Sequence, residues 1–154
     1  MDLRNTLNRY YYDTTVSDLR MFNRSGQGDL SYNSVMYLDV IAYQATQEGG
    51  CTVSTLAKTL HITNSAATIK VNELVKKGFV KKMQGETDRR FTYLTLTDSV
   101  RTALKAYDSP FERAVGQVEK QFAPEELETF CAVLKAFTDA YTGEDKNEPA
   151  TPTI

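Results

Sequence analysis

One face of a predicted helix over residues 64–77 carries side chains that could bind the edges of nucleic-acid bases. Its outward positions, spaced i, i+3, i+4, i+7 and i+11, are Ser65, Thr68, Ile69, Asn72 and Lys76. Hydroxyls can donate or accept hydrogen bonds, an asparagine amide can pair with adenine, and an isoleucine can contact a thymine methyl. The apolar positions that predict the buried side are Ala67, Val71, Leu74 and Val75. The alternative interpretation is a solvated face on which Ile69 is a stray apolar residue.

Positive charge is concentrated around this helix. The chain as a whole has a formal net charge of −2, but residues 58–90 contain eight basic residues and three acidic ones, a local balance of +5. The rest of the chain carries −7. A basic segment on an acidic protein is typical of a module that faces phosphates, and a solvated lysine-rich surface is the equally weighted alternative.

The sequence contains few residues suited to catalysis or to metal binding. His61 is the only histidine, and Cys51 and Cys131 are the only cysteines among the 154 residues. A zinc site or a Ser-His-Asp triad would depend on these few groups, so we expect no catalytic site, no metal site and no cofactor. Cys51 precedes a predicted helix whose dipole could lower the pKa of its thiol, which leaves redox sensing open as a minor alternative.

Helical periodicity alternates with turn and capping signals through the first half of the chain. The predicted helices cover residues 3–22, a segment capped by Ser31 and stopped by Gly49 and Gly50, a segment capped by Thr52 or Ser54 that runs through Leu60, and residues 64–77, capped by Thr63 and closed by Gly78. His61 lies in the turn between the last two helices, where we expect a left-handed backbone. Helix, tight turn and helix follow one another here.

The pattern changes to strand periodicity after this unit. Residues 79–83 and 91–96 alternate around a polar tip, 84–90, which predicts a hairpin that projects as a wing. A long helical stretch follows, in which Ser109, Pro110 and Glu112 resemble a helix start, so we expect a kink or break near Asp108. Pro124 opens a last helix. No apolar period continues from Thr142 onward.

These elements predict a mainly α protein with a small β-hairpin wing, a winged helix-turn-helix with long N- and C-terminal dimerisation helices. The expected parts are an N-terminal dimerisation helix and loop (1–30), a DNA-binding domain (31–98), C-terminal dimerisation helices (99–141) and a disordered tail (142–154). The terminal helices carry more apolar residues than one small core can bury, and we expect a dimer interface at Leu3, Leu7, Phe122, Phe130, Leu134, Phe137 and Tyr141.

Several motifs carry a family resemblance. They are Val53-Ser-Thr-Leu-Ala, the segment from Ile62-Thr to Leu74-Val-Lys-Lys-Gly-Phe-Val80, the wing Asp88-Arg-Arg90 closed by Leu94-Thr-Leu-Thr97, and Pro124-Glu-Glu-Leu127. Over about residues 30–141 the chain resembles the MarR family of bacterial transcription regulators. The resemblance implies an obligate dimer joined through the first, fifth and sixth helices. It also implies recognition helices in successive major grooves, with Arg90 of the wing in the minor groove.

The wing motif also makes physical sense. Asp88 can hold the guanidinium of Arg90 at an angle that a flexible tip would not fix, and a narrow minor groove concentrates negative potential. The expected DNA-binding residues are Thr63, Asn64, Ser65, Thr68, Ile69, Lys70, Asn72, Lys76, Lys81, Asp88, Arg89 and Arg90. Many members of the family carry a basic or polar residue where this chain has Ile69, so their base contacts do not transfer.

The resemblance further implies a small apolar, phenolic or acyl effector bound beside the dimer helices. Tyr11, Phe22, Tyr32 and Tyr37 are the expected lining residues. Cysteine-sensing relatives carry their cysteine near the chain start, which neither Cys51 nor Cys131 matches. We therefore expect a homodimeric, sequence-specific regulator of double-stranded DNA, most simply a repressor released by its effector.

The predicted DNA target is a pseudo-palindromic operator with half-sites about 10 to 10.5 base pairs apart. The alternative function is a winged-helix protein-interaction module that does not bind DNA. No apolar run approaches the ~20 residues of a membrane span, and the first residues lack the apolar stretch of a secretory signal, so we expect a cytoplasmic protein without membrane contact.

Overall fold

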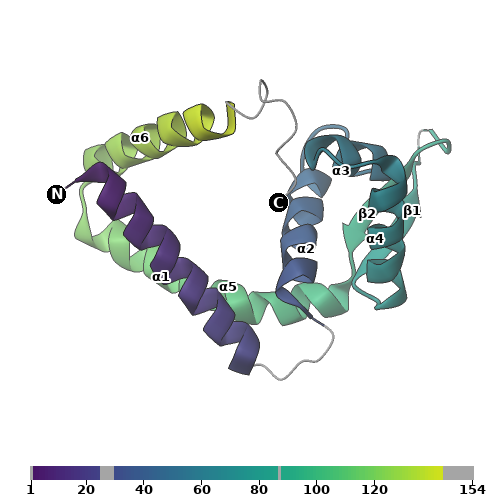
Figure 1. Cartoon of the computed structure of the whole chain (residues 1–154), viewed down its shortest axis with the longest axis horizontal. Helices are drawn as coiled ribbons and strands as arrows, with labels where there is room; N and C mark the ends of the chain where they lie inside the picture. Colours follow the sequence, from purple (N-terminus) through teal and green to yellow (C-terminus); the bar gives the residue numbers. More distant parts are fainter. Residues whose placement is uncertain (1, 25–29, 87, 144–154) are drawn as a thin grey trace, which may run out of the picture. The chain divides into compact units, whose positions relative to one another are not determined.

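The computed structural model describes residues 2–24, 30–86 and 88–143. In chain order these residues form α1 (Leu3–Arg24), α2 (Tyr32–Ala45), α3 (Val53–Thr59), α4 (Asn64–Lys76), β1 (Val80–Gln84), β2 (Thr92–Leu96), α5 (Asp98–Gln121) and α6 (Pro124–Gly143) (Figure 1). The chain divides into two compact units, Met1–Tyr107 and Asp108–Ile154, and each is described by itself. None of the helices in the described ranges has the length and apolar content that crossing a membrane requires.

Short polar side chains begin the helices of the first unit, as predicted. Ser31, Thr52 and Thr63 each accept a hydrogen bond at 3.1 Å from the backbone N–H three residues ahead. Ser54, the alternative cap for α3, is wrong as a cap because it lies within the helix. His61 has a φ of 53° in the turn between α3 and α4, and Gly78 has a φ of 74° after α4, where a residue without a Cβ is unstrained.

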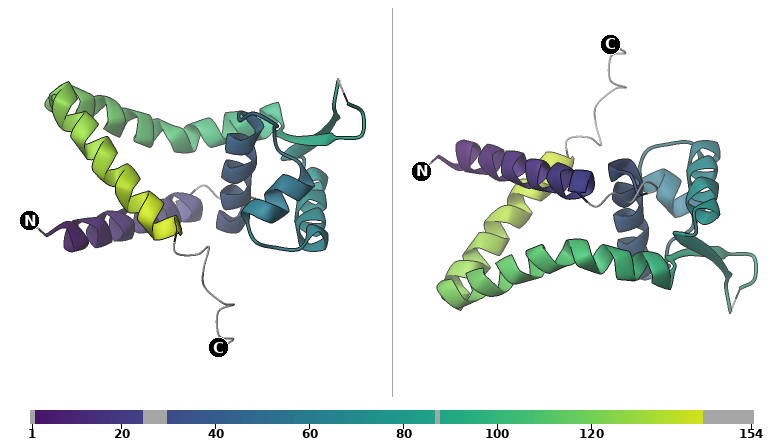
Figure 2. Two further views of the ribbon diagram at one scale, coloured as in Figure 1. Left: turned by 90° about the horizontal axis from the view of Figure 1, so that it is seen from above. Right: turned by 90° about the horizontal axis from the view of Figure 1, so that it is seen from below.

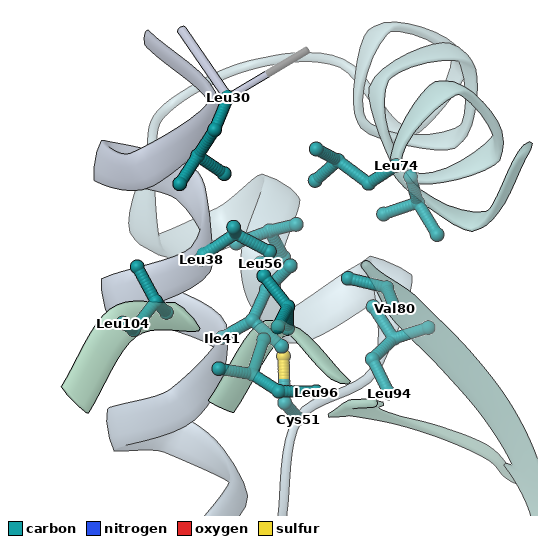
Figure 3. Close-up of a cluster of buried hydrophobic side chains, with 12 residues drawn as sticks. Leu30, Leu38, Ile41, Cys51, Leu56, Leu74, Val80, Leu94, Leu96 and Leu104 are labelled. Carbon is teal, nitrogen blue, oxygen red and sulfur yellow. The ribbon is translucent and has the colours of Figure 1, made fainter. Parts of the chain in front are cut away.

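The core of the first unit lies among α2, α3, α4, the hairpin and the first turns of α5 (Figure 3). Its fully buried side chains include Leu38 and Ile41 of α2, Leu56 of α3, and Leu74 of α4. Each fully buried leucine or isoleucine contributes about 1.5 to 3 kcal/mol of transfer free energy. This core fixes the position of α4 against α2 and α3.

The hairpin is antiparallel, with Val80 opposite Leu96 and Gln84 opposite Thr92. Val80, Leu94 and Leu96 are buried, so one face of the hairpin root packs on the core. The backbone N–H of Leu94 also donates to the carbonyl of Cys51 at 2.7 Å. This bond joins the segment before α3 to the edge of β2 that does not pair with β1. The predicted wing is confirmed, and it extends beyond α3 and α4 in both views of Figure 2.

The long helix α5 continues through Ser109 and Pro110, so the break expected near Asp108 is wrong, whereas the kink expected there stays a prediction. Ser109 does not cap a new helix; its hydroxyl oxygen accepts a bond from Arg113 Nη1 at 3.1 Å. A proline inside a helix removes one backbone hydrogen bond and costs about 3 kcal/mol, and Pro110 nevertheless lies inside α5.

The last helix extends two residues further than predicted. Thr142 and Gly143, expected to open the disordered tail, still belong to α6. The Thr142 hydroxyl donates to the carbonyl of Thr138 at 2.8 Å, and the ring of Tyr141 stacks on that of Phe137. The remaining predicted tail, 144–154, lies outside the described residues.

Candidate nucleic-acid interface

Helix α4 presents two faces of opposite character, as the sequence predicts. Ala67, Val71 and Leu74 are fully buried against the core. The outward residues are all exposed, namely Ser65, Thr68, Ile69, Asn72 and Lys76. Ile69 is 71% exposed, so an apolar side chain lies in the middle of a polar surface, and the described residues leave most of it uncovered. Thr63 and Asn64, at the start of α4, are exposed as well.

Two hydrogen bonds set which groups this face offers. The Thr68 hydroxyl donates to the carbonyl of Asn64 at 2.7 Å, so its only proton is used and its oxygen is left as an acceptor. The Asn72 Oδ1 accepts a bond of 2.8 Å from Lys82 Nζ of β1. That bond links the outward face of α4 to the hairpin, and it leaves the amide Nδ2 of Asn72 as the donor end.

The tip of the hairpin holds Arg90 through Asp88. Arg90 Nε donates to both carboxylate oxygens of Asp88 at 3.1 Å, Nη2 donates to Oδ2 at 2.8 Å, and the backbone N–H of Arg90 donates to Oδ1 at 2.9 Å. These hydrogen bonds lower the pKa of the Asp88 carboxyl and raise that of the guanidinium. The Arg90 side chain is still 87% exposed, so it is oriented and accessible at the same time.

The turn around Asp88 is closed by backbone contacts. The N–H of Phe91 donates to the carbonyl of Asp88 at 3.2 Å, and the N–H of Gly85 donates to the carbonyl of Phe91 at 2.9 Å. Gln84 adds a side-chain bond of 2.8 Å from Nε2 to the carbonyl of Arg89. A Cβ on Gly85 would lie 2.5 Å from the carbonyl oxygen of Asp88, so this turn can form only around a glycine.

The root of the hairpin is closed by the segment that follows α4 and is tied to α5. The Thr97 hydroxyl donates to the carbonyl of Gly78 at 2.7 Å, and the Thr97 N–H donates to the carbonyl of Phe79 at 2.9 Å. Arg101 of α5 reaches back to Thr95, where Nη2 donates to Oγ1 at 2.7 Å. The hairpin is therefore anchored at its base by α5 and in its middle by Asn72 of α4, and its tip is closed by its own hydrogen bonds.

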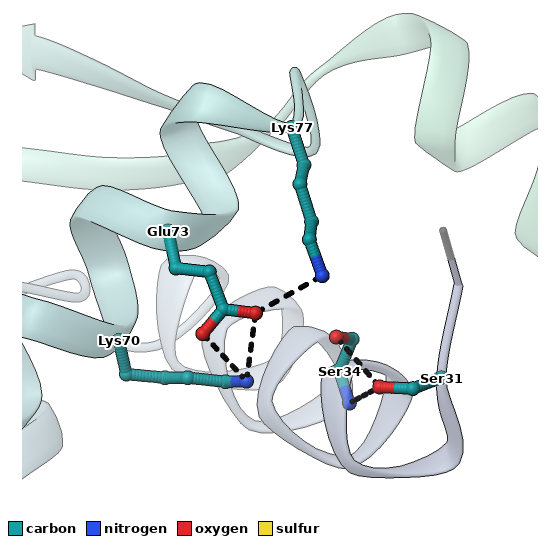
Figure 4. Close-up of polar contacts among 5 residues, drawn as sticks. All are labelled: Ser31, Ser34, Lys70, Glu73 and Lys77. Carbon is teal, nitrogen blue, oxygen red and sulfur yellow. Dashed lines mark hydrogen bonds and ion pairs between the residues drawn. The ribbon is translucent and has the colours of Figure 1, made fainter. Parts of the chain in front are cut away.

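Lys70, an expected DNA contact, lies on a different face from the other candidates. Its side chain is only 16% exposed, pairs with Glu73 at 3.3 Å, and has its ammonium 5.3 Å from the centre of the Tyr37 ring in α2. Glu73 also pairs with Lys77 at 3.0 Å, and the three side chains extend to the same side of α4 (Figure 4). Hydrogen bonds from Lys77 and Lys70 lower the pKa of Glu73. Lys70 thus fastens α4 to α2.

The two neighbouring lysines of β1 point to opposite faces of the hairpin. Lys82 pairs in register with buried Leu94 and reaches Asn72, whereas Lys81 pairs with Thr95 on the other face. Lys81 is exposed, as is Arg89 at the tip. Sequence reasoning named Lys81 and missed Lys82. Strand alternation counted from buried Val80 was the signal that could have placed Lys82 on the same side as the core.

Burial opposes the redox interpretation of Cys51. Burial raises the pKa of the Cys51 thiol, and a hydrogen bond with Thr55 lowers it by less, so the expected lowering is wrong. Cys131 is exposed on α6. Within the described ranges, no three histidine, cysteine, aspartate or glutamate side chains are grouped to hold a metal.

The residues expected to line an effector site are spread over α1 and α2. Tyr11 is 73% exposed, Tyr32 is 38% exposed, and Tyr37 is partly buried beneath Lys70. The Phe22 side chain lies outside the described residues. The residues expected at a dimer interface retain large exposed apolar areas, with Leu7 the most covered of Leu3, Leu7, Phe122, Phe130, Leu134, Phe137 and Tyr141.

Comparison with known proteins gives consistent matches. A model of the MarR family matches residues 40–92. The chain is 30% identical over 102 residues to the transcriptional regulator AdcR of Streptococcus pneumoniae, covering 64% of this chain and 67% of AdcR. It is 27% identical over 88 residues to YwhA of Bacillus subtilis, an uncharacterized HTH-type transcriptional regulator, covering 57% of this chain and 63% of YwhA. The match therefore spans less than two thirds of YwhA.

Solved structures extend the likeness over most of the fold. FabT of Streptococcus pneumoniae, solved in complex with DNA, has a TM-score of 0.65 at 22% identity and covers 95% of this chain and 97% of its own. MepR of S. aureus, solved with ethidium bromide, has a TM-score of 0.57 at 21% identity, with 86% and 95% covered. At these identities the likeness establishes the winged helix-turn-helix fold.

Proposed function

The chain belongs to the MarR family, and from that premise we propose that it is a transcriptional regulator that binds double-stranded DNA as a homodimer. Helix α4 enters the major groove, and Arg90 of the wing enters the adjacent minor groove. A protein that binds chromosomal DNA in this way acts in the cytoplasm. The related sequences named above are described as transcriptional regulators, in line with this proposal.

The observation that carries this proposal is the clamped and exposed Arg90 on a wing anchored to the outward face of α4. A guanidinium held by three side-chain hydrogen bonds loses less conformational freedom on entering a groove than a free one does. The surrounding segment, residues 58–90, supplies the local balance of +5 that attracts phosphates. Exposed short polar residues on α4 allow its backbone to approach base edges.

A two-fold dimer supplies the second half-site. Phe130 and Tyr141 of α6 are 62% and 72% exposed, and Leu3 of α1 is 58% exposed. Apolar area on this scale is typical of a surface covered by a partner. A dimer implies a pseudo-palindromic operator whose half-sites lie about 10 to 10.5 base pairs apart. Sedimentation at micromolar concentration tests this part, and a monomeric mass would refute it.

Selection from a randomised duplex library tests DNA binding. We expect an enriched motif with two-fold symmetry, and we expect Arg90→Ala to weaken binding to that motif on the order of tenfold or more. Glu86→Ala, a neighbouring exposed residue of the tip, is the matched control and should bind at least as tightly as the wild type. If no duplex is enriched and the protein captures only other proteins, the interaction-module alternative is correct.

We propose further that an apolar, phenolic or acyl effector releases the DNA, which makes the protein a repressor. Tyr11, Tyr32 and Tyr37 supply aromatic area with a polar hydroxyl, and Phe22 supplies an aromatic ring without one, as such a ligand requires. The effector acts only through its differential affinity for the DNA-competent spacing of the two recognition helices, and reciprocity requires DNA to weaken effector binding by the same factor. Titration of aromatic carboxylates and fatty acyl compounds against the free protein and its DNA complex tests this; equal affinities would refute it.

A further inference from the structure

The hydrogen bond between Asn72 and Lys82 changes what Asn72 offers to DNA. Asparagine pairs with adenine in a bidentate manner, by donating from Nδ2 to N7 and accepting at Oδ1 from the N6 amino group. In this protein the Oδ1 of Asn72 already accepts from the Lys82 ammonium at 2.8 Å. The adenine amino group would have to donate to the same oxygen and would then lie beside the Lys82 ammonium, which is also a donor and carries a positive charge. Binding of adenine in this manner is therefore disfavoured.

The pair instead presents donors alone. Nδ2 of Asn72 carries two N–H groups, and the Lys82 ammonium has two more after its bond to Asn72. Both residues are exposed, and they come from the outward face of α4 and from the hairpin strand packed beside it. Guanine has two acceptors, N7 and O6, on its major-groove edge, whereas adenine has one acceptor and one donor.

We propose that Asn72 and Lys82 together determine specificity at one base pair of each half-site, where they select guanine over adenine. The inference rests on the proposed function, because it assumes that α4 lies in the major groove. Lys82 acts partly as a positioning residue, since it fixes which end of the Asn72 amide faces the base. The wing strand thereby contributes to major-groove readout as well as to the backbone contacts expected of a wing.

The test uses full-length protein and the operator that the wild type selects from a randomised duplex library. Affinities are measured by fluorescence anisotropy for that operator and for every single base-pair replacement in it. At one position per half-site, we expect guanine to adenine replacement to weaken wild-type binding on the order of tenfold. Asn72→Ala should abolish that difference.

The lysine variants separate specificity from general affinity. Lys82→Met should lose the guanine preference at that position and accept adenine, because the freed amide can rotate. Lys82→Arg keeps a donor beside Oδ1 and should keep the preference. The double variant Asn72→Ala/Lys82→Met should show the same base preference as Asn72→Ala alone. Lys81→Met, on the opposite face of the strand, should weaken all duplexes equally and leave the preference intact.

The outcomes distinguish this inference from the proposed function. If the wild type enriches no motif, the proposed function fails and the inference falls with it. If a motif is enriched but Lys82→Met lowers all affinities uniformly, as Lys81→Met does, the inference is wrong and the proposed function stands. Equal thermal midpoints for the variants, expected because both lysines are exposed, confirm that the comparison is between folded proteins.

Discussion

Replacing Gly85 with alanine should weaken DNA binding without unfolding the protein. Gly85 lies at the end of the hairpin, and its N–H donates to the carbonyl of Phe91 at 2.9 Å. An added Cβ would stand 2.5 Å from the carbonyl oxygen of Asp88 and 3.1 Å from the Tyr93 ring. The nearest obstacle is backbone rather than the end of a flexible side chain, so the turn itself must move.

The size of the effect follows from that geometry. The oxygen of Asp88 must retreat by about 0.9 Å to restore an ordinary contact of 3.4 Å. The turn bond from the N–H of Phe91 to the same oxygen is already 3.2 Å long and does not survive such a displacement. Losing one such bond destabilises the fold by about 1 kcal/mol, which lowers Tm by about 2 to 4 °C. The larger effect falls on Arg90, whose orientation depends on Asp88.

Operator binding and thermal unfolding together check the prediction. We expect Gly85→Ala to lower affinity on the order of tenfold, similar to Arg90→Ala, since both remove an oriented guanidinium from the groove. In a variant that carries both changes, the second should add little to the first. Wild-type affinity for Gly85→Ala would refute the argument that the closed turn positions Arg90. A decrease in Tm much larger than about 2 to 4 °C would instead indicate that Gly85 is required for the stability of the whole fold.

Three further changes test the core, the thiols and the clamp. Leu74→Ala, at a fully buried position, should lower the free energy of unfolding by about 2 to 5 kcal/mol in urea denaturation at fixed protein concentration, whereas Ile69→Ala, on the exposed face, should change it by less than about 0.5 kcal/mol. A thiol reagent at neutral pH should modify Cys131 quickly and Cys51 only after unfolding, because burial raises the pKa of the Cys51 thiol; two fast thiols would contradict this. The Asp88 carboxyl should titrate below 3.8 in the folded protein, so the clamp stabilises at higher pH and is lost as pH falls through the lowered pKa. Carboxyl-carbon NMR measures that midpoint, and Arg90→Ala should return it toward 3.8.

Local signals in the sequence predicted the elements well. The hydroxyls of Ser31 and Thr63 cap their helices by accepting from backbone N–H groups only three residues away. The left-handed turn at His61 lies between two adjacent helices and likewise depends on residues close in sequence. The hairpin followed from two-residue alternation. Each of these features depends on neighbours within one or two turns of chain, so the sequence contains the whole of the interaction.

Features that depend on packing between elements were not predictable in the same way. The Lys82 ammonium reaches Asn72, ten residues away, only because β1 packs against α4 in a particular register. Lys70 looks like any helix-surface lysine in the sequence, but its ammonium lies over the ring of Tyr37 in α2. The Cys51 thiol was expected to respond to the helix that follows, and its burial has the stronger and opposite effect.

The charge that can reach phosphates is smaller than the composition of residues 58–90 indicates. Two of its eight basic side chains, Lys70 and Lys77, are paired with Glu73, and a third, Arg90, is held by Asp88. Each phosphate that a lysine or arginine neutralises contributes about −0.9 to the slope of log affinity against log salt. Because Lys70 and Lys77 are occupied within the protein, we expect them to add little to that slope, and in the proposed DNA complex the salt-dependent part of binding falls to exposed residues such as Lys76 and Lys81. Arg90 differs from both groups, since its carboxylate partner orients the guanidinium while leaving its side chain 87% exposed. The basic segment thus uses some of its charge to hold α4 and the wing in place, and under the proposed function the remainder is available to DNA phosphates.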